Sequence, residues 1–171
     1  MDDEDFIFGR IRRNDETISN CDGVNEYPGQ FGNVLRYYES IGPFCNKRPE
    51  EVCVTVRWDW GTCIDQGDVQ VHPVAYTMFN SSNLEQGYLG DVGASNSPQF
   101  SFNLEGSGSF FMVFQQVYPG TDGIGCEFQF EVDFGLCNEA EAYFPIFGED
   151  VVVKDPGNNV DPMKSVRSFD G

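Results

Sequence analysis

The chain has 171 residues, and its 28 acidic and 10 basic residues give a formal net charge of −18. That charge argues strongly against nucleic acid as a partner, because neutralising phosphates needs clustered Lys and Arg. No apolar run reaches the ~20 residues that a membrane-spanning helix needs, so no membrane span is expected.

Short alternating segments separated by Gly and Pro clusters predict β-strands along the chain. The clearest alternation is in CEFQFEVDF, where four apolar side chains are expected to face inward and the acidic and amide side chains to face water. The inward set is Phe128, Phe130, Val132 and Phe134. The expected strands cover residues 5–12, 33–41, 52–58, 69–79, 99–104, 109–118 and 126–134.

Seven short strands with turn clusters between them are typical of an all-β fold, an antiparallel β-sandwich of jelly-roll-like type. Pro73 is expected at an edge or a bulge, and Pro43 in a loop. GSGS at 106–109 is expected to be a hairpin turn. The stretch 81–91 is expected to hold one helical turn at most.

Six cysteines without any C-x-x-C pair indicate disulfides and an extracellular or cell-surface location rather than a zinc ribbon. They are Cys21, Cys45, Cys53, Cys63, Cys126 and Cys137. Six cysteines allow 15 pairings, and the pairing stays open. A direct Cys53–Cys126 bridge is disfavoured, because the two lie on opposite faces of their predicted strands. The first residues, MDDEDFIFGR, do not have the pattern of a secretory signal.

The expected organisation is an N-terminal extension at 1–5, a β-sandwich domain at 6–137 and an extended C-terminal segment at 138–171. An ordered tail of this composition needs a surface to pair with, either its own sheet edge or another copy. Apolar residues near both ends are therefore candidates for an assembly contact. They are Phe6, Ile7, Phe8, Tyr143, Phe144, Ile146, Phe147, Val151, Val152 and Val153.

Four stretches resemble a family of bacterial extracellular domains. They are CDGVNEYPG, VCVTVRWDWGTC, AYTMFNSSNLEQGYLGDVGAS and FFMVFQQVYPGTDGIGCEFQFEVDFGLC. Together they are similar to the pre-peptidase C-terminal and proprotein-convertase P-domain-like jelly rolls of secreted surface proteins. The most specific parts are residues 88–95 and 117–126. The resemblance implies an accessory role in support, binding or adhesion rather than catalysis.

Candidate catalytic chemistry is sparse. His72 is the single histidine, so a Ser-His-Asp device would need it, and a structural role is the expected one. Calcium is a possible ligand, since it takes hard oxygen ligands from loops. The calcium candidates are Asp22, Asp65, Asp68, Asp91 and Asp122. Five aromatic residues could stack on a carbohydrate, although core packing is the expected fate of most. They are Tyr37, Tyr38, Trp58, Trp60 and Tyr88.

The sequence thus predicts a non-enzymatic extracellular structural protein. The first hypothesis is a subunit of a surface filament or similar homopolymer, joined through its terminal segments by β-strand addition. The alternative is a calcium-assisted adhesion module that binds carbohydrate or protein. No cofactor is expected apart from the calcium that the alternative would use.

Overall fold

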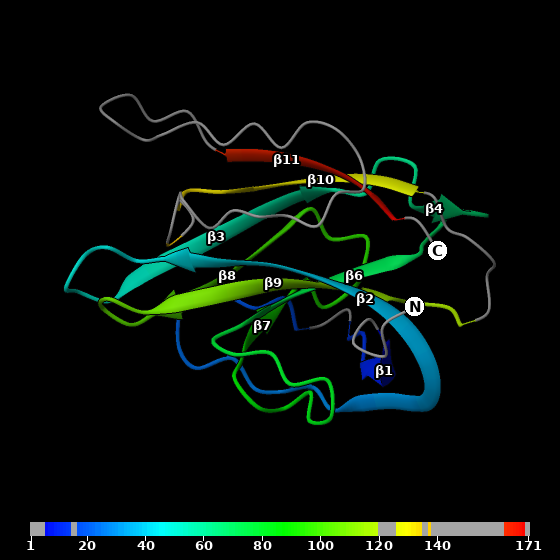
Figure 1. The fold of residues 1–171 in the computed structure, drawn as a ribbon, viewed down its shortest axis with the longest axis horizontal. Coiled ribbons are helices and arrows are strands. Elements are labelled where there is room, and N and C mark those ends of the chain that lie inside the picture. The colour runs from blue at the N-terminus through cyan, green and yellow to red at the C-terminus, as the bar shows by residue number, and fades with distance from the viewer. Residues whose placement is uncertain (1–5, 15–16, 120–125, 135–136, 138–162, 170–171) are drawn as a thin grey trace.

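The computed structural model describes residues 6–14, 17–119, 126–134, 137 and 163–169, the last range by its backbone. It is an all-β protein whose two antiparallel sheets pack as a sandwich, and no helix occurs in these ranges (Figure 1). The expected fold class is confirmed. None of the described residues belongs to a helix that could cross a membrane.

Five strands form the first sheet and four form the second. The first has the order β1-β2-β9-β6-β7, with β1 Phe6–Ile11, β2 Gln30–Cys45, β9 Ser109–Gln116, β6 Val71–Tyr76 and β7 Tyr88–Asp91. The second has the order β11-β10-β3-β8, with β11 Met163–Phe169, β10 Cys126–Val132, β3 Val52–Asp59 and β8 Gln99–Leu104. A separate short hairpin joins β4 Ile64–Asp65 to β5 Asp68–Val69.

The core lies between the two sheets and is largely aromatic. Phe128 on β10 meets Phe114 on β9 at 4.3 Å between ring centroids, and Phe102 on β8 meets Phe110 on β9 at 5.1 Å. Along β10 the burial alternates as the sequence predicts, with Glu127 and Gln129 exposed. The alternating side-chain pattern of β10 therefore marks its inward face correctly.

β2 is longer than predicted and passes through Pro43. The strand tolerates Gly42 and Pro43 because its register with β9 shifts between Ile41 and Phe44. Gly42 has φ +141, and a Cβ there would come within 3.0 Å of the Phe110 carbonyl oxygen. A bulge thus carries the proline, where the sequence predicts a loop.

The stretch GSGS at 106–109 is not a hairpin turn. It joins β8 to β9, and these strands belong to different sheets. The expectation of a hairpin is wrong because two alternating strands can be joined in either of two ways. A hairpin within one sheet and a crossing from one sheet to the other both leave the apolar faces of the strands in the core.

β7 differs from expectation, whereas Pro73 has one side of its strand unpaired among the described residues, as an edge position requires. β7 forms at residues 88–91, where at most a helical turn is expected, and it covers one side of β6. β6 is therefore an inner strand, and no register shift between β6 and β9 falls at Pro73. The first β6–β7 pair is Val74 with Asp91, so at Pro73 only β9 pairs with β6.

Three disulfides are present, and they are Cys21–Cys53, Cys45–Cys137 and Cys63–Cys126. Cys53 and Cys126 are not joined, as their opposite faces predict. Cys45 ends β2 in the first sheet and Cys137 follows β10 of the second, so this bridge links the two layers. The three bridges indicate an oxidising environment, extracellular or secretory.

Truncating Phe130 tests the core. Its ring lies 5.1 Å from that of Phe114 and 6.2 Å from that of Phe44, between centroids. Phe130→Ala is expected to lower the free energy of unfolding by about 3–5 kcal/mol, measured by urea denaturation with the disulfides intact. Gln129→Ala is the matched control on the exposed side of β10 and is expected to change little. Equal losses at both positions would contradict the assigned inward face.

Unreduced mass spectrometry tests the bridges. The protein is expected to be lighter by six hydrogens than its fully reduced form, because all six cysteines are paired. Peptide mapping should return the three pairings above. Titratable thiols in the native protein would contradict this arrangement.

Candidate functional site

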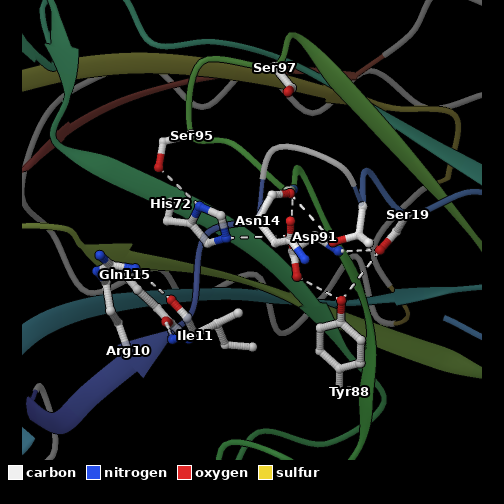
Figure 2. Close-up of polar contacts among 12 residues, drawn as sticks. Arg10, Ile11, Asn14, Ser19, His72, Tyr88, Asp91, Ser95, Ser97 and Gln115 are labelled. Atoms are coloured by element: carbon white, nitrogen blue, oxygen red, sulfur yellow. Dashed lines mark hydrogen bonds and ion pairs between the residues drawn. The ribbon is translucent and has the colours of Figure 1, made fainter. Parts of the chain in front are cut away.

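Buried polar side chains gather where β6 and β7 meet the loop that follows β7 (Figure 2). His72 lies on β6 and is fully buried, with Nδ1 3.0 Å from the Ser95 hydroxyl. On its other side, Nε2 is 3.5 Å from Asp91 Oδ1. The single histidine thus stands between a serine and an aspartate.

Asp91 organises the backbone at the end of β7. Its carboxylate accepts hydrogen bonds from the Tyr88 hydroxyl at 2.7 Å and from the Gly93 amide at 2.5 Å. Its own amide donates to the Ser19 hydroxyl at 2.9 Å. Burial, and then the charge of Asp91, raise the pKa of Tyr88 well above its usual value, so this phenol stays protonated.

The same three residue types can serve nucleophilic catalysis, but here their surroundings favour a structural role. A catalytic serine must be reached by the carbonyl carbon that it attacks, and Ser95 is only 1% exposed. His72 Nε2 also makes no hydrogen bond with the described residues. The contacts of Ser95 and Asp91 instead fix the loop between β7 and β8 onto β6.

The five calcium candidates do not gather in the part of the chain that the structure describes. Asp91 is engaged by Tyr88 and Gly93, and Asp68 forms an ion pair with Arg13 at 2.9 Å. Asp22 lies in an exposed loop, and Asp65 is at the β4–β5 hairpin. Within the described ranges, no group of three acidic, His or Cys residues could hold a metal ion. Asp122 lies outside them, so calcium binding stays a prediction.

The N-terminal assembly candidates take part in the fold of their own chain. Ile7 is buried, and Phe6 packs on Tyr37 with 4.4 Å between ring centroids. Phe8 is 65% exposed and is the one of the three left facing solvent. The remaining candidates lie outside the described residues, namely Tyr143, Phe144, Ile146, Phe147, Val151, Val152 and Val153.

The aromatic residues considered for carbohydrate stacking are mainly packing residues. Trp58 is buried, with its indole N–H donating to the Ser97 carbonyl oxygen at 2.7 Å. The other four are partly buried against the hydrophobic core, and they are Tyr37, Tyr38, Trp60 and Tyr88.

The C-terminal segment does supply a strand, at a place that the sequence analysis missed. β11 pairs antiparallel with β10 along seven consecutive positions, from Cys126 opposite Phe169 to Val132 opposite Met163. β11 is the last strand of the second sheet, beside β10 (Figure 1). The alternation of apolar and polar residues in MKSVRSF is weak. The only sequence signal for a strand there is that the segment after Pro162 contains no Gly or Pro.

Replacing Asp91 tests the structural role of this cluster. Asp91→Ala leaves the Tyr88 hydroxyl and the Gly93 amide without their acceptor, and each buried unpaired donor costs about 1–3 kcal/mol. The free energy of unfolding should fall accordingly in urea denaturation. Asp22→Ala, in an exposed loop, is the control and should change it by less than about 0.5 kcal/mol. Equal, small effects would mean that the cluster does not hold the loop.

Comparison with protein-family models, with curated proteins and with solved structures finds no match. The resemblance to the pre-peptidase C-terminal and P-domain-like jelly rolls is therefore supported only as far as an antiparallel β-sandwich.

Proposed function

We propose that this chain is a non-enzymatic extracellular structural protein whose copies join when β11 of one copy adds to β10 of another. The observation that carries the proposal is the seven-position register between β10 and β11. A strand that pairs in its own chain can make the same backbone hydrogen bonds with an identical edge on a second copy, as in domain swapping.

The β10 edge suits this role because a disulfide, core packing and pairing with β3 fix the position of the strand. Cys126 at its start is tied to Cys63, and Phe128 and Phe130 are buried in the core. On the side away from β11, β10 pairs with β3 from Gln129 to Val132. A fixed edge presents its donors and acceptors at constant spacing, which favours addition of an extended segment.

Chain length allows β11 to reach a neighbouring copy. The disulfide at Cys137 anchors the chain, and 25 residues, 138–162, separate it from Met163. A fully extended chain of that length spans roughly 85 Å. The radius of gyration expected for a domain of about 130 residues is only about 14 Å.

Charge also favours this pairing. Two basic residues, Lys164 and Arg167, lie on β11. The register places Lys164 opposite Glu131 and Arg167 opposite Phe128, so Lys164 is the one that faces an opposite charge. Opposite charges at facing positions stabilise strand pairs by roughly 0.2–1 kcal/mol, so β11 matches this edge better than an acidic segment would.

The second hypothesis, a calcium-assisted adhesion module, has less support from the described residues. Asp68 and Asp91 already have protein partners. The buried Ser95, His72 and Asp91 likewise favour a non-enzymatic role, because no substrate carbonyl can reach Ser95 in this arrangement.

A proline in the middle of β11 tests strand addition. The Glu127 backbone faces Thr62 on the β3 side, so the alternate residue Phe130 directs its N–H and C=O toward β11. Ser165 lies opposite Phe130, and Ser165→Pro removes a backbone donor of this ladder and restricts the strand. Sedimentation velocity should show concentration-dependent assembly of the full chain and its loss in Ser165→Pro, with the sandwich still folded by circular dichroism. Asn159→Pro is the control and should assemble like the original chain. A strictly monomeric full chain, or unchanged assembly of Ser165→Pro, would overturn the proposal.

A further inference from the structure

Three of the chain's seven arginines fall within four residues, in the segment RIRR at 10–13. The structure places all three around one cavity of about 630 Å³, beside the loop that follows β7. Phe31, Asp68, Ser95 and Asn96 also line this cavity. Its volume lies in the range of small-molecule sites. A cationic cavity in a chain of net charge −18 needs an explanation.

Arg10 is held rigidly at the cavity wall. It is 5% exposed, and it donates from Nη1 to the Ile11 carbonyl at 2.7 Å and from Nε to the Val117 carbonyl at 3.3 Å. Its guanidinium also lies 4.6 Å from the centre of the Phe31 ring. Arg36 on β2 donates to the same Val117 carbonyl oxygen and is buried too. Two buried guanidinium groups therefore share one neutral acceptor.

One carboxylate serves this group of arginines among the described residues. Asp68 binds Arg13 through both oxygens, at 2.9 and 3.5 Å, and also accepts from the Tyr118 hydroxyl. Arg12 is exposed and makes no side-chain hydrogen bond or ion pair with any described residue. Counted over the described residues alone, the four arginines Arg10, Arg12, Arg13 and Arg36 have one aspartate among them, a local formal charge of 4 − 1 = +3.

The electrostatics of Arg10 agree with an excess of positive charge. Burial first, and then the charges of Arg13 and Arg36, lower its pKa to about 10. Arg10 is still protonated at neutral pH. An anion in the cavity would offset the repulsion that these groups exert on one another.

We propose that this cavity binds an acidic sugar of the uronate type, with its carboxylate on Arg12 and within the field of the buried Arg10. Planar guanidinium groups match a carboxylate in two-point hydrogen bonding. The Asn96 amide and the Asp68 carboxylate can pair with sugar hydroxyls, and Phe31, 49% exposed, offers an apolar wall. Asp68 disfavours a phosphate dianion, because its own negative charge lines the same cavity.

Binding of sodium D-glucuronate to the full chain tests this proposal, followed by NMR titration in the presence of EDTA. Arg12→Gln is the variant of choice, because Arg12 has no described partner and its loss should not disturb the fold. It should weaken glucuronate binding by about tenfold or more. Arg48→Gln removes an exposed arginine outside the cavity and should leave the affinity unchanged. D-Glucose, which lacks the carboxylate, should not bind measurably.

Three results would overturn the proposal. Inorganic phosphate that binds as tightly as glucuronate, and depends equally on Arg12, would mean a general anion site. Absence of glucuronate binding would reject the site outright. Asp15 and Glu16 follow Arg13 in the chain, so the titration is repeated with Asp15→Asn/Glu16→Gln. Binding only in that variant would mean that the chain's own carboxylates take the place of the ligand.

Discussion

Packing of aromatic side chains between the two sheets is the constraint on which the structure depends. Phe114 on β9 touches both Phe128 and Phe130 on β10, so one ring of the first sheet fixes the position of two in the second. Because these contacts and the Cys45–Cys137 bridge hold β10 in place, its outer edge is a fixed surface. The arginine cavity depends on the same frame, since Arg10 and Arg36 are positioned by the carbonyl of Val117 at the end of β9.

Side-chain patterns in the sequence predict faces well and connections poorly. The alternation of Phe128, Phe130 and Val132 marks an inward face wherever the strand lies, and the structure agrees. That alternation is the same whether the next strand pairs in the same sheet or crosses to the other, so the β8–β9 crossing at 106–109 could not be read from it. β7 was missed because its four residues are too few for a period.

For the functional candidates too, the sequence indicates the character of single residues, whereas their partners depend on the fold. The burial of His72 agrees with the structural role expected of a lone histidine, but its partners Ser95 and Asp91 are distant in sequence and depend on the fold of the β7–β8 loop. The RIRR segment is visible in the sequence as a basic cluster in an acidic chain. Its proposed role depends on Asp68 and Asn96 lying at the same cavity, which only the tertiary structure shows.

The central claim is that β10 accepts β11 from another copy, and amide hydrogen exchange tests it most directly. An isotope-labelled chain ending at residue 162 keeps all three disulfides but lacks the strand that pairs with β10. Adding unlabelled full chain should slow exchange at alternate β10 amides, those that face β11, while the amides that face β3 stay unchanged. Full chain carrying Ser165→Pro should give no such protection. Unchanged exchange with the original full chain in excess would contradict strand addition between copies.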